Sequence, residues 1–164
     1  MSIFKLGVYV EELDDVYREI EIKDSQTFMQ FHEAIMKAFA LKKKIQASFF
    51  ISNSRWQKLN EVTLGYSSVF EKAINGTEAS IGSVVPAVTK NLIYFNEEVS
   101  EYTILIQLEG TAEEDKKKTY PVLVKSNGKI TFGFGANIFS EDMGINEGDL
   151  SEESGFSDVN QDLE

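Results

Sequence analysis

SQTFMQFHEAIMKAF, residues 25–39, carries the clearest secondary-structure signal in the chain. Its apolar face consists of Phe28, Phe31, His32, Ile35 and Phe39. These residues follow the i, i+3, i+4, i+7 spacing of one helical face, with polar residues on the opposite side. Thr27 and Gln30 form the T-x-x-Q pattern of a capping box. We therefore predict a helix over residues 27–41 that begins at a Thr27 cap.

This helix needs a sheet to pack on. Burying its four large apolar side chains contributes roughly 6–12 kcal/mol as an upper bound, which is comparable with the whole stability of a small domain. An isolated helix of this length is marginal in water. The sequence therefore predicts an α+β domain, in which strands supply the surface that the helix covers.

Extended segments flank the helix on both sides. Strands are predicted at 3–10, 16–22, 47–52, 62–64, 91–95, 102–109, 120–125 and 129–134. A short acidic turn between the first two indicates an antiparallel hairpin, and Asn127–Gly128 indicates another. Arg18 interrupts an apolar strand face, so we expect its charged head to reach water. A short helix is predicted at 77–85, ended by Pro86.

These elements predict one α+β domain over residues 1–139. We expect a mostly antiparallel sheet, the main amphipathic helix packed on one face, and additional short helices. The expected strand order is left open. Residues 140–164 differ in composition and are predicted to form a separate acidic C-terminal tail that is weakly ordered or pinned by a few apolar anchors.

The acidity of the chain is concentrated in that tail. The net charge is −11, yet residues 140–164 hold nine acidic residues and no Lys or Arg, leaving eighteen acidic against sixteen basic residues in the remainder. We predict that the tail engages a basic protein partner or the chain's own body. Candidate partner contacts are Trp56, Glu152, Glu153, Phe156 and Asp158.

Composition excludes several other functions. The chain has no cysteine, which rules out disulfides and thiol chemistry. MSIFKLGVYVEEL, residues 1–13, lacks the pattern of a signal peptide, and no apolar run approaches a membrane span of ~20 residues. A cytoplasmic location without membrane partners is the expectation. The overall negative charge disfavours nucleic acid as a partner.

No motif for catalysis or cofactor binding is convincing. His32 is the single histidine, and we interpret it as a packed residue at the edge of the helix rather than as a base or ligand. The glycine pair in 133–135 lacks the rest of a phosphate loop, and 142–153 lacks the central glycine of a calcium loop. Lysines 42–44 and 116–118 are interpreted as solvated charges. No cofactor or metal is expected.

Three segments together resemble a known family. REIEIKDSQTFMQFHEAIMKAF (18–39), SFFISNSRWQKLNEVTL (48–64) and NLIYFNEEVSEYTILIQLEG (91–110) are similar to the plasmid pRiA ORF-like family, also labelled insertion-element TnpR-like passenger proteins. The similarity is closest to variants with an acidic C-terminal tail, and it covers roughly residues 3–126 as a domain. The resemblance implies a compact α+β domain and a plasmid or mobile-element setting, without a demonstrated reaction.

The chain departs from this family at two places. Many members have Gly-Trp after the Ala-Phe of the helix, where this chain has Ala40 and Leu41. Many also carry a Tyr-Asp-Phe-Gly-Asp stretch and a following Trp-Glu-His, where residues 93–98 and 101–103 here differ. A catalytic or metal role for that cluster would therefore be lost in this chain.

The sequence favours a non-enzymatic binding or accessory protein. Two alternatives remain at this stage: a metal-dependent enzyme with a hidden site, and a nucleic-acid-associated accessory protein. Trp56 illustrates the choice, because with Phe49 and Phe50 it could stack a base, although core packing is the commoner role of such residues.

Overall fold

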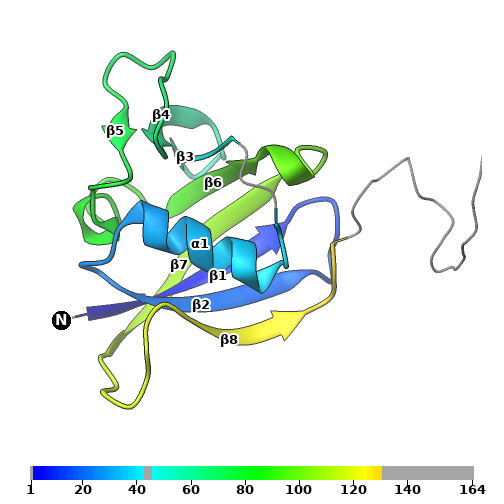
Figure 1. Cartoon of the computed structure of the whole chain (residues 1–164), viewed down its shortest axis with the longest axis vertical. Coiled ribbons are helices and arrows are strands. Elements are labelled where there is room, and N and C mark those ends of the chain that lie inside the picture. The colour runs from blue at the N-terminus through cyan, green and yellow to red at the C-terminus, as the bar shows by residue number, and fades with distance from the viewer. Residues whose placement is uncertain (1, 43–45, 131–164) are drawn as a thin grey trace, which may run out of the picture. The chain divides into compact units, whose positions relative to one another are not determined.

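The computed structural model describes residues 2–42 and 46–130 (Figure 1). Eight strands and one α-helix lie within these residues, together with two single turns of 3-10 helix. In chain order they are β1 (Ser2–Val10), β2 (Tyr17–Lys23), α1 (Phe28–Ala38), β3 (Ala47–Ser52), β4 (Lys58–Thr63), β5 (Ile74–Asn75), η1 (Ile81–Ser83), β6 (Asn91–Asn96), η2 (Glu97–Val99), β7 (Ile104–Glu113) and β8 (Val122–Asn127).

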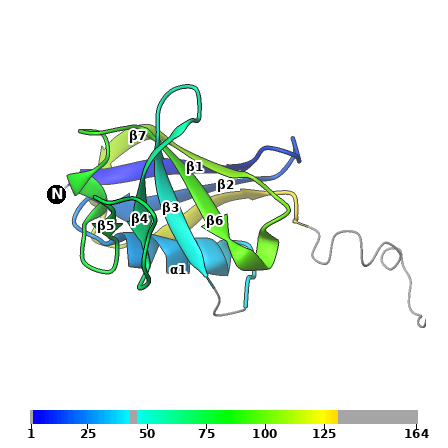
Figure 2. The same cartoon turned by 90° about the horizontal axis from the view of Figure 1, so that it is seen from above.

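All eight strands belong to one sheet. Its order is β5-β4-β3-β6-β7-β1-β2-β8. Every neighbouring pair is antiparallel except β4 with the two-residue strand β5, which are parallel. The helix α1 lies on one side of the strands, as the two views show (Figures 1 and 2). The hairpin predicted between the first two strands is confirmed by the β1–β2 pairing.

The predicted α+β class is wrong. The described residues form a sheet-dominated fold, because one mixed eight-stranded sheet accounts for nearly all of the regular structure and a single α-helix accompanies it. The segment predicted as a helix at 77–85 contributes only η1. Two of its backbone donors are used elsewhere: Ile81 N donates to Gln26 O at 2.7 Å and Gly82 N to Asp24 O at 2.8 Å. A helix cannot propagate when its N–H groups bond to a distant loop.

The N-terminal capping box of α1 is confirmed. The Thr27 hydroxyl accepts from Gln30 N at 3.2 Å, and the Gln30 side chain accepts from Thr27 N at 2.8 Å. Phe28 and Phe31 are fully buried, each with its ring centroid 5.4 Å from that of Phe49 on β3. The apolar face read from the sequence is therefore the face that packs on the sheet.

The helix ends three residues earlier than predicted, in a Schellman motif. Leu41 N donates to Met36 O at 2.8 Å, and Ala40 N donates to Lys37 O at 3.3 Å. Ala40 itself has a φ of +56°. This left-handed position is normally occupied by glycine, because a Cβ atom is strained there.

Arg18 does not reach water as predicted. Its side chain is buried, and its guanidinium donates to four backbone carbonyls, those of Tyr17, Ala38, Asn127 and Gly128, at 2.7–3.1 Å. Its Cζ also lies 4.6 Å from the centre of the Phe39 ring. Burial lowers the pKa of Arg18. This residue therefore ties the end of α1 to the β2–β8 edge of the sheet.

Candidate functional site

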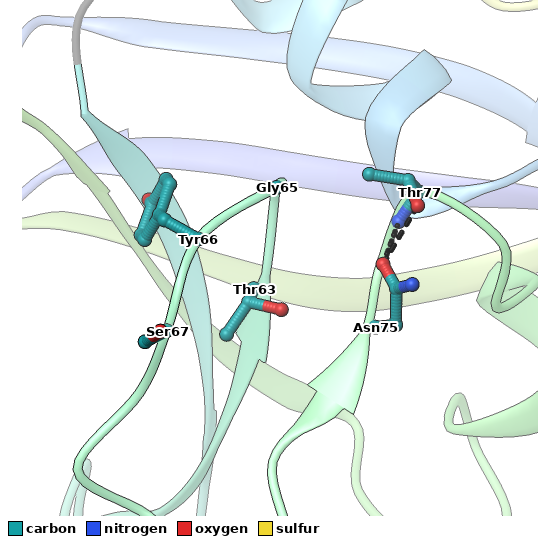
Figure 3. Close-up of a pocket in the computed structure, with 6 residues that line it drawn as sticks. All are labelled: Thr63, Gly65, Tyr66, Ser67, Asn75 and Thr77. Atoms are coloured by element: carbon teal, nitrogen blue, oxygen red, sulfur yellow. Dashed lines mark hydrogen bonds between the residues drawn. The ribbon is translucent and has the colours of Figure 1, made fainter.

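A pocket of about 430 Å³ opens beside the parallel β4–β5 pair (Figure 3). Its lining residues come from the end of β4, the following loop, β5 and the turn after it: Thr63, Gly65, Tyr66, Ser67, Asn75 and Thr77. Figure 3 shows Thr63 and Asn75 on neighbouring strands, with Gly65 and Tyr66 on the loop that follows Thr63.

Backbone pairing positions these side chains. Thr63 and Asn75 are register partners, and Gly76 N donates to Thr63 O at 2.7 Å. The Asn75 side-chain oxygen accepts from Thr77 N at 3.0 Å and from the Thr77 hydroxyl at 2.7 Å (Figure 3). Gly65 has a φ of +103° and turns the loop away from β4. The pocket thus has a hydrogen-bonded frame.

Gly76, between the lining residues Asn75 and Thr77, has no room for a side chain. A Cβ atom there would lie 2.7 Å from Val62 Cγ1 and 2.8 Å from Thr63 O. The close approach of the turn to β4 therefore depends on glycine at this position.

The pocket lining is neutral and polar. It offers hydroxyls, one side-chain amide and backbone groups. Such uncharged groups can donate and accept hydrogen bonds without changing their protonation state. Burial raises the pKa of the one titratable lining group, the Tyr66 phenol, so the phenol stays protonated at neutral pH. The arrangement is suited to holding a small uncharged molecule.

His32 lies outside this pocket and is hydrogen-bonded. Its Nδ1 is 2.8 Å from the hydroxyl of Tyr94, which is 2% exposed and also accepts from Asn96 Nδ2 at 2.9 Å. The Tyr94 hydroxyl therefore has hydrogen-bond partners in both His32 and Asn96. Burial lowers the pKa of His32. His32 is thus hydrogen-bonded at the edge of the core, as predicted, whereas the absence of a role as a base or ligand stays a prediction.

Trp56 lies in the β3–β4 turn, half-buried, with a φ of +62°. The Asn53 side chain caps this turn by accepting from Arg55 N at 2.9 Å and Gln57 N at 3.0 Å. The aromatic group proposed around Trp56 is divided between the faces of the sheet. Phe49 packs under α1. Phe50 is on the other face, and the centre of its ring lies 4.2 Å from Lys58 Nζ.

The other predicted contact residues, Glu152, Glu153, Phe156 and Asp158, lie outside the described residues, as do segments 133–135 and 142–153. Of the lysines at 116–118, Lys118 forms an ion pair with Glu21 at 3.1 Å. Within 2–42 and 46–130, no three His, Cys, Asp or Glu side chains are grouped as a metal would need. The same ranges contain no helix that is long and apolar enough to span a membrane.

The pocket residues were missed by the sequence analysis. Hydroxyl and amide side chains in short loops have no periodicity, and Ile74–Asn75 is too short to be recognised as a strand. The available signals were Gly65 and the Asn75–Gly76 dipeptide, both typical of turns. They indicate where the chain turns but not that two turns meet.

The fold and these sites define, over residues 2–42 and 46–130, a sheet-dominated domain with one mixed sheet, one covering helix and a neutral surface pocket. The chain belongs to the family of plasmid pRiA4b ORF-3-like proteins, whose model matches residues 2–133. A protein of unknown function from Methanosarcina mazei Go1 has a similar fold, with a TM-score of 0.66 and 14% sequence identity over 76% of this chain and 69% of that one. Comparison with curated proteins finds no match. The family prediction is confirmed.

Proposed function

We propose that this protein is a non-enzymatic binding or accessory protein of a plasmid or mobile element, and that its acidic segment 140–164 engages a basic protein partner in the cytoplasm. The observation that carries the proposal is the uneven charge of the sequence. Nine acidic residues and no basic ones lie in 140–164, whereas the other 139 residues have a net charge of −2. Such a one-sided field attracts a basic partner and accelerates its association.

The test measures binding of an octa-arginine peptide to the full-length chain by calorimetry. Replacing Glu152, Glu153 and Asp158 with Gln, Gln and Asn should weaken binding by at least tenfold. The matched control, Glu11→Gln, Glu71→Gln and Glu78→Gln, changes the net charge equally at exposed positions of the body and should weaken binding less than threefold. Equal losses in the two variants would contradict the proposal.

The neutralised variant also separates the alternatives. A tail that screens its own body should, once neutralised, expose lysines and increase the retention of the protein on heparin. A nucleic-acid-associated protein should in addition bind single-stranded DNA in a salt-dependent manner. A loss of octa-arginine binding with no gain on either polyanion supports a basic partner.

A second candidate function is the capture of a small polyhydroxylated molecule in the pocket. The observation that favours it is the uncharged hydroxyl and amide lining of Thr63, Ser67, Asn75 and Thr77. Titration with glucose should shift the backbone amide signals of Gly65, Ser67 and Thr77 selectively. Asn75→Ala should abolish these shifts, because it removes both the amide and the acceptor that orients Thr77.

A further inference from the structure

Two tyrosines and a glutamate gather on the face of the sheet that α1 does not cover. Tyr9 lies between the buried core residues Val8 and Val10, so its side chain projects to the opposite face. Tyr17 is its register partner on β2, and their ring centroids are 4.9 Å apart. We call Tyr9, Tyr17 and Glu109 the tyrosine–carboxylate cluster.

A β-bulge brings Glu109 to this face. Lys5 pairs with Gly110 and Leu6 with Leu108, so Glu109 is the extra residue in β7. Its carboxylate lies over Gly7, where a Cβ atom would be 2.5 Å from Glu109 Oε2. Any other residue at position 7 would displace the carboxylate. The bulge and Gly7 together place it beside the tyrosines.

The two phenols hold this carboxylate. Tyr9 donates its hydroxyl proton to Glu109 Oε2, and the Tyr17 hydroxyl lies 2.9 Å from Glu109 Oε1 and 3.1 Å from Glu19 Oε1. Each carboxylate oxygen has two lone pairs, so Glu109 keeps acceptor capacity after both bonds. Burial, together with the hydrogen bond to Glu109 and its charge, raises the pKa of Tyr9 to about 12 and also raises that of Tyr17. Both phenols therefore remain donors at neutral pH.

The charge of Glu109 is not balanced within the described part of the chain. Glu19 has Lys125 at 3.8 Å, and Glu21 has Lys118 at 3.1 Å. No ion pair to Glu109 occurs among residues 2–42 and 46–130. An exposed carboxylate beside two aromatic rings, on a face where the neighbouring carboxylates are paired, is complementary to a cation supplied from outside.

We propose that the tyrosine–carboxylate cluster is the docking point for an arginine side chain of the basic partner. Arginine is favoured over lysine because a planar guanidinium can bond both oxygens of Glu109 while it lies against a tyrosine ring, whereas an ammonium is a compact, strongly hydrated charge. The inference rests on the proposed function and adds a contact on the body of the protein to the one proposed for residues 140–164.

The test compares Glu109→Gln with Glu113→Gln in the full-length chain. Both residues are exposed on β7 and both variants lose one negative charge, but Glu113 lies outside the cluster. Glu109→Gln should weaken octa-arginine binding at least fivefold, and Glu113→Gln less than twofold. Octa-lysine should bind the native chain more weakly than octa-arginine and should distinguish the two variants less.

NMR of the native chain gives a result that does not depend on a variant folding. Octa-arginine should shift the ring signals of Tyr9 and Tyr17 more than that of Tyr120, which lies outside the cluster. Equal effects of the two Gln variants, or unshifted Tyr9 and Tyr17 signals while octa-arginine still binds, would overturn the cluster as a docking point and leave the tail proposal intact. Absence of any octa-arginine binding would overturn both proposals.

Discussion

The two faces of the sheet differ in what their side chains do. On the face that α1 covers, Phe28, Phe31 and Phe49 are fully buried, and the rings of Phe28 and Phe31 both pack against that of Phe49. On the other face, Tyr9 and Tyr17 are half-buried and bond the exposed Glu109. Apolar burial contributes most of the folding free energy, whereas exposed polar groups remain available to partners. The apolar core therefore lies on one face of the sheet, and the proposed docking point lies on the other.

Phe31→Ala should have the largest effect. It removes a fully buried ring from the helix face and should cost about 3–5 kcal/mol of unfolding free energy. Phe50→Ala, on the opposite face, removes a half-buried ring and should cost roughly 1–2 kcal/mol. Urea denaturation followed by circular dichroism measures both changes. Similar costs would show that the second face also carries a core.

Arg18→Ala should have the next largest effect on the unfolding free energy. It leaves the carbonyls of Ala38, Asn127 and Gly128 without their donor, at a cost of roughly 2–4 kcal/mol. Arg18→Lys keeps the charge but cannot reproduce the planar fork, so it should recover less than half of the loss. Full recovery by lysine in the same denaturation assay would show that charge, and not geometry, is what matters.

Gly76→Ala should cost about 1–3 kcal/mol, because its new Cβ must displace Val62 or the backbone of Thr63. It should also abolish any ligand-induced shifts at Ser67 and Thr77, since the turn forms one side of the pocket. Gly82→Ala, where a Cβ would instead meet Asp24 O at 2.9 Å, serves as the control for loop strain away from the pocket. Loss of the pocket signals in both variants would point to general unfolding.

Ala40→Gly should stabilise the protein by roughly 0.5–1 kcal/mol. The φ of +56° strains alanine but not glycine, although part of the gain is offset by the greater entropy of glycine in the unfolded chain. Ala34→Gly, in the middle of the helix, should destabilise by a similar amount. A thermal unfolding series distinguishes the two signs. A lower Tm for Ala40→Gly would mean that the Ala40 side chain makes a contact of its own.

The smallest expected effect is a pH dependence from His32. Because burial lowers its pKa in the folded chain, the unfolded chain binds the proton more readily, and stability decreases as the pH falls below the ordinary histidine value of about 6.5. Above that pH the imidazole is neutral in both the folded and the unfolded chain, so His32 causes no loss of stability there. His32→Gln should flatten the dependence between pH 7 and 5. If the slope of stability against pH did not change in this variant, the pH dependence would come from the carboxylates and not from His32.

Local patterns in the sequence were sufficient for much of the fold. The Thr27 capping box and the spacing of Phe28, Phe31 and Ile35 specified α1 and its buried face before any sheet was known. Alternating residues also indicated most strands, because a side-chain period of two is a property of the strand itself. The family resemblance rested on the same segments.

Long-range contacts decided the remainder. Residues 77–85 have a helical pattern, but their N–H groups bond the 24–26 turn, and that competition is invisible in the segment alone. The position of Arg18 among carbonyls from α1 and β8 likewise depends on strand order.

The sequence by itself determined the cap, the apolar face of the helix, the strand periodicity and the concentration of acids in 140–164, since each depends on neighbours a few residues apart. The tertiary structure alone decided the mixed sheet, the pocket beside β4 and the approach of Glu109 to Tyr9 and Tyr17. Those features arise when segments separated by up to about a hundred residues pair across a sheet, and the free energy of such pairing depends on partners that no local pattern identifies.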